Sequence, residues 1–345
     1  MPGLLPGTHA TKSPKEQLIS TIRTGDHFDL STGFRSNTNN LDTRIHQRPN
    51  RSSFMKANVS IIVLSLMRLA QTRRTINSIF THTSSEFELI IVDMGSKGDA
   101  LTYLSLLSQQ KQNVHVVYNT NNTGTSAGRN QGLALATKEW VVFLDNDTEV
   151  SEGWIEALLA RSVNPKVGAC APRLLSKSGR ILIAPCSLVA EKSKGRLTRV
   201  GFRFEQSLLA DDLLASEPQT IPWYPTTCLM ARRTILEEID GFDESLFMAE
   251  EDKDLCLRIS EAGFDILYVP ESSVVHLQLE KDPKYRAIRD NLAVIQKDID
   301  TFEAKWQCKV VMECRRSYLK DLGMSDRAIN LKKRFDIFST VIEDE

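Results

Sequence analysis

The stretch Trp140–Val150, WVVFLDNDTEV, decides the predicted fold class of this chain. Its first five residues are apolar, with β-branched and aromatic side chains among them, and they run directly into Asp145, Asn146 and Asp147. An apolar run of this length before polar turn-forming residues is typical of a strand buried on both faces of a parallel sheet. The acidic residues would then lie at the carboxyl end of that strand, where open α/β sheets bind ligands.

Asp145 and Asp147 allow two interpretations. Carboxylate oxygens are ligands that Mg²⁺ and Mn²⁺ prefer, so the pair is suited to an ion that carries a phosphorylated substrate. An Asp-Asn-Asp sequence is also ordinary turn chemistry after a core strand. The stretch alone supports both interpretations equally, and the rest of the sequence favours the first.

The composition is that of a globular chain with one large domain or two modest ones. Its 345 residues are 41% hydrophobic and 25% charged, and the formal net charge is −1. That charge gives no reason to expect nucleic acid as a partner. No apolar run approaches the roughly 20 residues of a membrane-spanning helix, and no segment of signal-peptide type is expected at the N-terminus.

The six cysteines are scattered, without a C-x-x-C pair or a histidine at zinc-ligand spacing. Several of them stand among apolar residues, where a cysteine packs as a small core side chain. We therefore expect a reduced, cytoplasmic compartment, with a location peripheral to the membrane as the alternative.

Residues 1–57 are polar and weakly patterned. A segment of this kind cannot bury much apolar surface, so we expect a mobile N-terminal arm with one short helix near Glu16–Arg23. Its basic residues suit a solvated leader better than a contact with an anionic partner; they include Arg44, Arg48 and Arg51.

From Asn58 onward, apolar runs alternate with segments of helical periodicity. The runs VSIIVLSL, ELIIVDMGS, VHVVYN and WVVFLDND predict strands, and residues 68–80, 100–110 and 126–136 predict helices. This alternation with short connections predicts an α/β fold with a doubly wound, mixed but mostly parallel sheet flanked by helices. Asp93 and Asp145 would share the carboxyl edge of that sheet.

Nucleotide-binding fingerprints of the G-x-G-x-x-G and P-loop types are absent from the sequence. The glycine-rich segment NNTGTSAGRNQG begins a predicted helix, and a helix N-terminus favours phosphate or another polar group. Packing and capping account for Gly124 and Gly128 equally well.

Residues 176–222 are less regular and contain several basic side chains. Such a segment is either a functional loop or, more commonly, a solvated insertion. After it, Trp223 and Tyr224 would form a sugar-stacking platform or pack in the core. The basic residues are Lys192, Lys194, Arg196, Arg199 and Arg203.

Residues 251–262 predict a short helix with acidic residues in its first turn, near the positive end of the helix dipole. Asp252 stands three residues before Leu255, so it is predicted to point inward and is a candidate general base. Asp254 and Arg258 are spaced for an i,i+4 ion pair, so Asp254 is predicted to be architectural.

His276 ends a further predicted strand, SSVVHL. A lone histidine there is usually a packed residue, but a carboxylate metal site in the same domain favours the interpretation as an additional ligand. Residues 281–345 predict a helical C-terminal extension, with a helix over 284–306, that covers the sheet domain or forms an oligomer contact.

Taken together, these residues resemble the family 2 glycosyltransferases, which have the nucleotide-sugar-binding fold called GT-A. The resemblance spans roughly Asn58–His276 and implies a catalytic domain over residues 58–280. It rests on ordered motifs: VSIIVLSL, ELIIVDMGS, NTGTSAGRNQGLALA, VVFLDNDTEV, GFDESLFMAEEDKDLCLRISEAGFDILYVP and VVHL.

The resemblance implies a nucleotide-sugar donor, with a UDP-sugar favoured, that binds with Mn²⁺ or Mg²⁺. Asp93 would accept a hydrogen bond from the base, Arg129 would lie near the base or ribose, and Asp145 would lie between the ribose and the metal. The implied donor-binding positions are Leu64, Asp93, Gly124, Arg129, Asp145 and Asn146.

The same resemblance implies the metal ligands and the general base. Asp147 would bind the ion that bridges the diphosphate, together with Asp145, and His276 would complete the shell. Asp252 would deprotonate the acceptor and Glu251 would position it. A base on one side of the sugar and an ion on the other imply a single displacement with inversion at the anomeric carbon.

Two departures concern the turns after the strands. The first strand of the family usually ends in a Pro-x-Tyr-Asn-like turn, where this chain has Leu64–Met67. The turn after Asp93 begins with Met94 instead of a small polar residue. The choice of nucleotide therefore stays open. A third feature is the run of acids at 250–252, among which helix phase favours Asp252.

Two alternatives carry less support. A sugar-1-phosphate nucleotidylyltransferase usually has a glycine-rich basic loop after its first strand, and LSLMRLAQTRR has no glycine. A catalytically silent sugar-nucleotide-binding or scaffold protein would be expected to lose Asp147, Asp252 or His276, which this chain keeps. The sequence leaves the acceptor open among a glycan, a small molecule, a lipid-linked sugar and a peptide. It also leaves open whether the protein forms a homo-oligomer. The basic segment 192–203 suggests an anionic or bulky acceptor.

Overall fold

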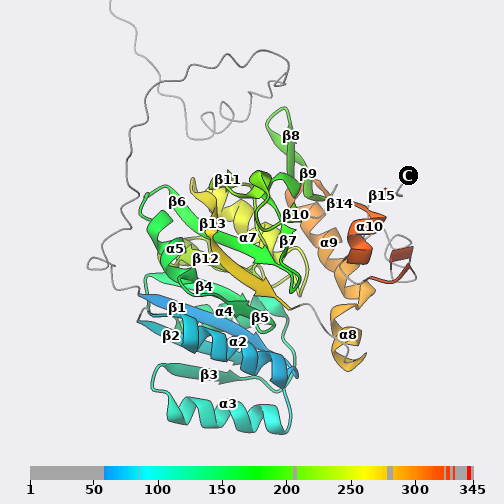
Figure 1. The fold of residues 1–345 in the computed structure, drawn as a ribbon. Helices are drawn as coiled ribbons and strands as arrows, with labels where there is room; N and C mark the ends of the chain where they lie inside the picture. The colour runs from blue at the N-terminus through cyan, green and yellow to red at the C-terminus, as the bar shows by residue number, and fades with distance from the viewer. Residues whose placement is uncertain are drawn as a thin grey trace, which may run out of the picture. The chain divides into compact units, whose positions relative to one another are not determined.

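The structure is a computed structural model that describes residues 58–342 except 85, 205–207, 278–282, 322–323, 327–328 and 331–339. Residues Met55–Glu345 form one compact unit (Figure 1). The predicted arm over 1–57 and its short helix lie outside the described residues, so both stay predictions.

The unit is built on an 11-stranded mixed sheet with the order β10-β7-β6-β12-β4-β1-β2-β3, to which β5, β11 and β13 add pairings off this path. Strands β1, β2, β3 and β4 are parallel neighbours, whereas β12 is antiparallel to β4. The strands are β1 Val59–Ser65, β2 Phe87–Asp93, β3 Val114–Tyr118, β4 Trp140–Asp145, β5 Thr148–Val150, β6 Val167–Leu175, β7 Arg180–Ile183, β10 Leu208–Leu209, β11 Gln219–Ile221, β12 Cys228–Arg232 and β13 Asp265–His276. The predicted mixed, mostly parallel sheet is confirmed.

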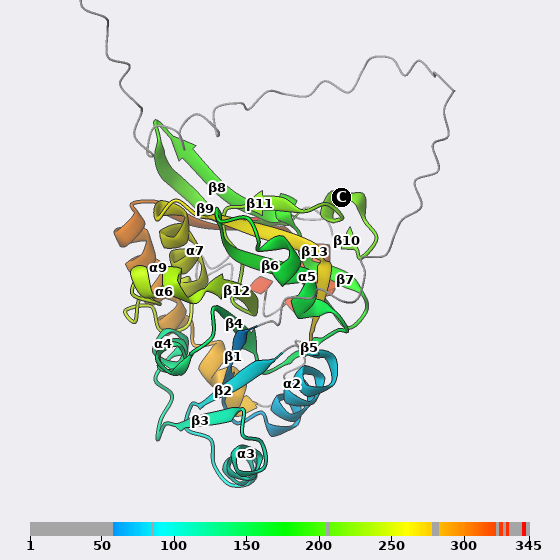
Figure 2. The ribbon, with the colours of Figure 1, turned by 90° about the vertical axis from the view of Figure 1, so that its left-hand side faces the viewer.

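Helices cover both faces of the sheet, which is why β1, β2 and β4 are continuous apolar runs. Figure 2 shows α2 and α5 on one face and α4, α6, α7 and α9 on the other. The helices are α2 Leu69–His82, α3 Asp99–Gln110, α4 Thr125–Leu135, α5 Trp154–Arg161, α6 Arg233–Glu238, α7 Glu251–Glu261, α8 Pro283–Arg289, α9 Leu292–Trp306 and α10 Arg316–Asp321, with short 3₁₀ turns η1 Pro185–Ser187 and η2 Leu213–Ala215.

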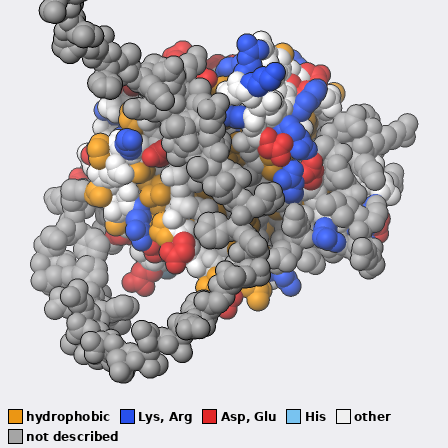
Figure 3. All heavy atoms as spheres, turned by 90° about the horizontal axis from the view of Figure 1, so that it is seen from above, with side chains coloured by type: hydrophobic (Ala, Val, Ile, Leu, Met, Phe, Trp, Pro, Cys, Tyr) orange, Lys and Arg blue, Asp and Glu red, His pale blue; other side chains and the backbone are white. Residues whose placement is uncertain are grey.

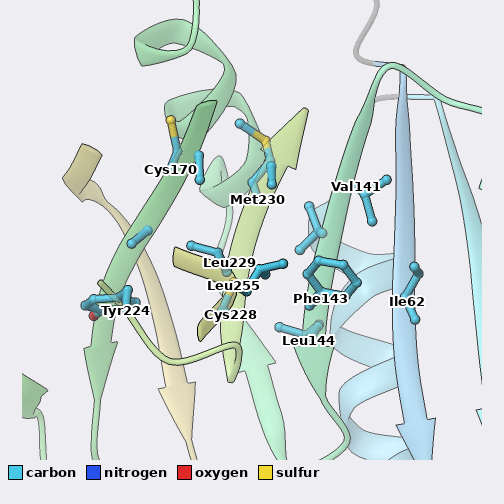
Figure 4. Close-up of a cluster of buried hydrophobic side chains, with 14 of the residues drawn as sticks. Ile62, Val141, Phe143, Leu144, Cys170, Tyr224, Cys228, Leu229, Met230 and Leu255 are labelled. Carbon is cyan, nitrogen blue, oxygen red and sulfur yellow. The ribbon is translucent and has the colours of Figure 1, made fainter. Parts of the chain in front are cut away.

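A single large core joins the strands to the helices above them. Figure 4 shows side chains of β4, β12 and α7 meeting in one cluster, among them Phe143, Leu229 and Leu255. The ring of Phe143 meets that of Phe242 edge to face, with the centroids 4.9 Å apart. The start of α7 is therefore fixed to the same core as the central strand of the sheet.

Trp223 and Tyr224 belong to this core. Both are fully buried, and each polar atom has a backbone partner: Trp223 Nε1 donates to Val189 O at 3.4 Å and Tyr224 OH donates to Pro172 O at 2.7 Å. The interpretation of this pair as a sugar-stacking platform is therefore wrong, and packing is the correct alternative.

A second, four-stranded sheet joins the segment that the sequence analysis left irregular, which carries β8 and β9, to the predicted C-terminal extension, which carries β14 and β15. Its order is β15-β14-β9-β8. The turn Lys194–Gly195, with positive φ at both residues (48° and 81°), joins β8 to β9 as a two-residue hairpin. At Gly201, a Cβ would lie only 1.8 Å from Val311 O, so glycine allows β9 and β14 to pair. The strands are β8 Leu188–Ser193, β9 Arg196–Phe204, β14 Lys309–Arg315 and β15 Thr340–Ile342.

This sheet corrects the prediction of a helical C-terminal extension over 281–345. The extension carries α8, α9 and α10 but also β14 and β15, so it is helical only in part. The expected helix over 284–306 is two helices, α8 and α9. The Asn291 side chain accepts a hydrogen bond from Val294 N at 3.4 Å and caps the start of α9. The pairing of β14 with β9 makes the extension part of the same compact unit as the catalytic domain predicted over 58–280.

Two further expectations from the sequence concern membrane-spanning helices and the burial of the cysteines. Within the described residues, none of the helices has both the length and the apolar character to span a membrane. Five of the cysteines are buried side chains, as expected for core residues: Cys170, Cys228, Cys256, Cys308 and Cys314.

Candidate active site

The candidate site lies at the point where the strand order of the sheet reverses. Strands β1, β2 and β3 follow one another outward, and the chain then returns to place β4 on the other side of β1. Open α/β sheets bind their ligands at the carboxyl ends of the strands at such a point. In the registers of β1, Ser65 pairs with Asp93 on β2 and Leu64 pairs with Asp145 on β4, so the two acidic strand ends share one edge as predicted.

Strand β13 brings His276 to the same edge. It runs antiparallel to β5, with His276 opposite Thr148, the residue that follows Asp147. As a result, ligand atoms of Asp145, Asp147 and His276 all lie within 4.8 Å of one another. The structure thus assembles the three predicted metal-ligating side chains from segments about 130 residues apart in sequence.

The chemistry of this cluster fits a divalent ion. His276 is buried, and its Nε2 lies 3.2 Å from Asp147 Oδ1, yet it makes no hydrogen bond of good geometry to a described residue. A buried ring nitrogen without such a bond is an unused ligand atom. Two carboxylates and one imidazole form a donor set that suits Mn²⁺.

Arg68 is the residue of this site that the sequence analysis missed. It is 5% exposed, and its Nη2 lies 2.9 Å from Asp147 Oδ2. Burial by itself raises the pKa of Asp147, but His276, Arg68 and Arg289 together hold it well below its usual range. The only signal in the sequence was a basic residue directly after the first strand, in LSLMRLAQ.

Arg129 connects the cluster of Asp145, Asp147 and His276 with the start of α7. Its Nη1 lies 2.7 Å from Glu251 Oε1 and its Nη2 lies 3.5 Å from Asp145 Oδ1. Thr125 Oγ1 donates to the same Glu251 oxygen at 3.0 Å. Arg129 and Glu251 therefore hold α4, β4 and α7 together, and their predicted contacts with donor and acceptor stay predictions.

The start of α7 carries Asp252 in an acidic surrounding. Asp252 is half-buried, and one of its carboxylate oxygens accepts a hydrogen bond from Lys253 N at 2.7 Å. Burial, opposed by the charge of Lys253 and reinforced by Glu251 and Glu250, raises the pKa of Asp252 to about 7. A carboxylate of this kind exchanges a proton near neutral pH.

Glu250 and Lys253 fix the backbone around Asp252. Glu250 has a left-handed backbone (φ 67°) at the cap position of α7, and its carboxylate lies 2.8 Å from Lys253 Nζ. Lys253 is 5% exposed and lies over the ring of Trp223, 4.6 Å from its centroid. A strained backbone residue held by a buried ion pair is a feature of functional sites.

Asp254 is architectural, as predicted. It is fully buried, and its carboxylate meets Arg258 Nε at 2.8 Å in the predicted i,i+4 pair. It also meets Trp306 Nε1 at 2.9 Å and Lys305 Nζ at 2.7 Å. Asp254 therefore ties α7 to the end of α9.

Asp298 on α9 is a second residue that the sequence analysis missed. It is fully buried, and its carboxylate accepts hydrogen bonds from the backbone N–H groups of Phe247, Met248 and Ala249 at 3.1, 2.8 and 3.0 Å. The backbone O of Phe247 in turn accepts from Thr125 N at 2.6 Å. This helix of the C-terminal extension thus positions the segment that leads into α7.

Asp93 is fully buried at the end of β2. Its Oδ2 accepts hydrogen bonds from the backbone N–H groups of Gly95 and Ser96 at 3.2 and 3.0 Å. Its Oδ1 is buried and has no hydrogen-bond partner among the described residues. A buried carboxylate oxygen without a partner is rare and is suited to a ligand donor.

Three other predicted donor-binding residues have structural roles. Gly124 has φ +90°, and a Cβ there would lie 2.7 Å from Phe247 Cδ2. Asn146 Nδ2 donates to Thr72 Oγ1 at 2.9 Å, which fixes the turn after β4 to α2. Leu64 is half-buried and packs against the core. Their contacts with a nucleotide sugar stay predictions.

Two arginines of the basic segment 192–203 are paired within the second sheet. Arg199 and Arg203 both pair with Glu191 and Glu313, and these bonds raise the pKa of each arginine. Figure 3, which views the molecule from above, shows basic and acidic side chains side by side on that surface. Two of the cations that suggested an anionic acceptor are therefore already paired.

Residues 60–240, more than half of the chain, match the model of the family described as glycosyl transferase family 2. This chain belongs to glycosyl transferase family 2. The match includes β1, β2 and β4 and therefore Asp93, Asp145 and Asp147.

Two curated proteins that are similar to this family 2 chain are from Mycobacterium tuberculosis. Pre-mycofactocin glycosyltransferase is 32% identical over 168 residues, which cover 47% of this chain and 32% of that protein. N-acetylglucosaminyl-diphospho-decaprenol L-rhamnosyltransferase is 29% identical over 143 residues, which cover 40% of this chain and 47% of that protein. The chain thus spans less than half the length of each.

Solved structures share the fold. The mannosyltransferase PcManGT from Pyrobaculum calidifontis, in complex with GDP-Man and Mn²⁺, has a TM-score of 0.51 at 15% identity and covers 72% of this chain and 65% of its own. S. aureus TarS 1–349, in complex with UDP-GlcNAc, has a TM-score of 0.50 at 18% identity and covers 69% of this chain and 64% of its own. At these identities the likeness shows the fold, which is that of GT-A glycosyltransferases.

Proposed function

We propose that this protein is a metal-dependent, inverting glycosyltransferase that moves a sugar from a nucleoside-diphosphate sugar to an acceptor nucleophile. The observation that carries the proposal is the cluster of Asp145, Asp147 and His276 at the point where the strand order reverses. Membership of glycosyl transferase family 2 supports it. Asp252 is the proposed general base.

The cluster would hold Mn²⁺ or Mg²⁺ through Asp145, Asp147 and His276. When bound there, the ion would neutralise the charge that develops on the nucleoside diphosphate as it leaves. Mn²⁺ is favoured because the set includes an imidazole and because the similar mannosyltransferase was solved with Mn²⁺.

Asp252 would take the proton from the acceptor as it attacks the anomeric carbon. A pKa of about 7 leaves a useful fraction of this carboxylate ionised at neutral pH while keeping it basic enough to accept a proton. Glu251, held by Arg129 and Thr125, would keep the start of α7 in place for this step. A single displacement of this kind inverts the anomeric carbon.

The nucleotide base would bind next to Asp93. Its Oδ1, buried and without a partner among the described residues, is suited to accept a hydrogen bond from the ring N–H of a base. Uracil and guanine both offer such an N–H, and the similar structures were solved with UDP-GlcNAc and with GDP-Man. We favour a UDP-sugar.

The test is release of the nucleoside diphosphate from UDP-, GDP- and TDP-linked sugars, with Mn²⁺ and then with EDTA. We expect release from one nucleotide class, lost with EDTA and in Asp147→Ala, and strongly reduced in Asp252→Asn. Release that persists in Asp147→Ala or in EDTA would contradict the proposed metal site. Release from none of the sugars would favour a silent sugar-nucleotide-binding protein.

A further inference from the structure

Arg68 occupies the position in the site where a metal ion would also be attracted. Both carboxylate oxygens of Asp147 have a neighbour: Oδ2 lies 2.9 Å from Arg68 Nη2, and Oδ1 lies 3.2 Å from His276 Nε2. The side chains of Arg68 and Asp147 are only 2% and 3% exposed. This ion pair is therefore part of the buried site and not a surface contact.

The backbone is strained at the point that delivers Arg68. Met67, just before it, has φ 61°, and Arg68 N donates to Leu66 O at 2.7 Å, which closes a three-residue turn around Met67. A γ-turn with positive φ at a residue other than glycine is rare and costs energy. Met67 N donates to Ser96 Oγ at 3.1 Å, which holds the turn against the segment after β2.

A second contact holds the guanidinium from the C-terminal side of the chain. The ring of Tyr285 on α8 lies 4.4 Å from the carbon of the Arg68 guanidinium. A cation over an aromatic face is stabilised, and more so when it is shielded from water. Strain in the turn, burial and this stacking contact together fix Arg68 at Asp147.

The charges explain why the site needs this residue. A buried carboxylate is costly unless a cation compensates it. Arg129 lies near Asp145, 3.5 Å away, whereas Arg68 contacts Asp147 directly. A divalent ion bound to Asp147 would compensate the same negative charge. Two cations at one carboxylate repel each other, so the ion and Arg68 would compete for Asp147.

We propose that Arg68 is a resident cation of the metal site, which holds Asp147 in place without metal and opposes the divalent ion that binds there. This inference rests on the proposed function. As a consequence, only the fraction of molecules in which Arg68 leaves Asp147 can bind the ion, and the apparent metal affinity falls in proportion to that fraction. Removing the guanidinium therefore tightens metal binding instead of weakening it.

The experiment measures Mn²⁺ binding to the full chain by electron paramagnetic resonance, with no nucleotide sugar present. We expect Arg68→Gln to bind Mn²⁺ about tenfold more tightly than wild type. Arg68→Lys, which keeps a positive charge, should stay closer to wild type. Arg74→Gln is the matched control, because Arg74 lies on α2, which begins directly after Arg68, and pairs with Glu149 at 2.6 Å at the surface.

Thermal unfolding separates this role from simple packing. Arg68→Gln removes the arginine in direct contact with Asp147, so the unfolding midpoint of the variant should fall without Mn²⁺. It should recover when Mn²⁺ is added, with a larger Mn²⁺-induced rise than in wild type. A purely structural arginine would lower the midpoint equally under both conditions, and that result would overturn the inference.

The two proposals fail differently. Equal Mn²⁺ affinities of wild type and Arg68→Gln, or weaker binding in the variant, would overturn the inference about Arg68 and leave the metal site standing. Absence of Mn²⁺ binding in every protein, wild type and Arg74→Gln included, would overturn the proposed function and with it this inference.

Discussion

Asp252 is the single residue whose protonation the proposed chemistry depends on. Because its pKa is raised to about 7, the rate at saturating donor should rise with pH and level off above that value. Asp252→Asn should lower the rate by about 10²–10⁴-fold and abolish this rise of the rate with pH, while Mn²⁺-dependent nucleotide binding is kept. A pH–rate profile of both proteins checks this. The same rise with pH in the variant as in wild type would contradict the role of Asp252 as the general base.

The same residue predicts how stability depends on pH. An unfolded aspartate has a pKa of about 3.9, so between about 4 and 7 the folded protein keeps a proton that the unfolded chain releases. The contribution of Asp252 to stability therefore falls as pH rises through this window. Urea unfolding of wild type should show this slope, and Asp252→Asn should flatten it.

Arg129 compensates Glu251 and Asp145 at the same time. Removing one partner of a buried ion pair leaves an uncompensated charge, so Arg129→Gln should lower the free energy of unfolding by about 3 kcal/mol. The exposed pair of Arg74 with Glu149 provides the control, since Arg74→Gln should cost less than about 1 kcal/mol. Equal losses in the two variants, measured by urea unfolding, would contradict the bridging role of Arg129.

Individual site residues could be predicted from the sequence where a local pattern marks them. Asp93 and Asp145 end apolar strands, and the parallel order of those strands brings them to one edge. Arg68 and Asp298 have no such mark, because their partners are 79 and about 50 residues away and only the folded chain joins them.

At the scale of elements, α9 positions the segment before α7 through one carboxylate. Asp298→Asn weakens the acceptor of three backbone N–H groups, so the free energy of unfolding should fall by about 3 kcal/mol and kcat should fall about tenfold. The dissociation constant of the Mn²⁺–nucleotide complex should hold, because Asp298 does not contact Asp145, Asp147 or His276.

The control for this prediction is on the same helix. Asp300 is exposed and accepts a hydrogen bond from Gln296 at 2.9 Å, so Asp300→Asn should change neither stability nor kcat appreciably. Steady-state kinetics and calorimetry of both variants separate the two effects. A loss of nucleotide affinity in Asp298→Asn equal to its loss of kcat would contradict a role confined to the α7 side.

The sequence patterns predict the order of the main strands and helices, but they do not predict which strands pair over long distances in the chain. Continuous apolar runs predict β1, β2 and β4, because strands covered on both faces need no polar positions. Strands β9 and β14 pair across about 110 residues, and both are half-exposed, so neither carries a buried-strand pattern. The second sheet is therefore visible only in the structure.

At the scale of the whole molecule, the C-terminal extension is built into the same compact unit as the main sheet. Lys305 and Trp306 meet the buried Asp254, and β14 extends the sheet of β8 and β9. A chain that ends at residue 281 would leave Asp254 without these two partners. We expect it to lose the cooperative thermal unfolding and the near-ultraviolet circular dichroism of the full chain; retention of both would contradict this integration.

The central claim is metal-dependent binding of a nucleotide at Asp145, Asp147 and His276. The most direct measurement is calorimetry with UDP, GDP and TDP, in Mn²⁺ and then in EDTA, on wild type, Asp147→Ala and Asp252→Asn. The account predicts that one nucleotide, UDP, binds only with Mn²⁺, and that binding is lost in Asp147→Ala and kept in Asp252→Asn. Binding that ignores EDTA and Asp147→Ala, or no binding of any nucleotide to wild type, would contradict it.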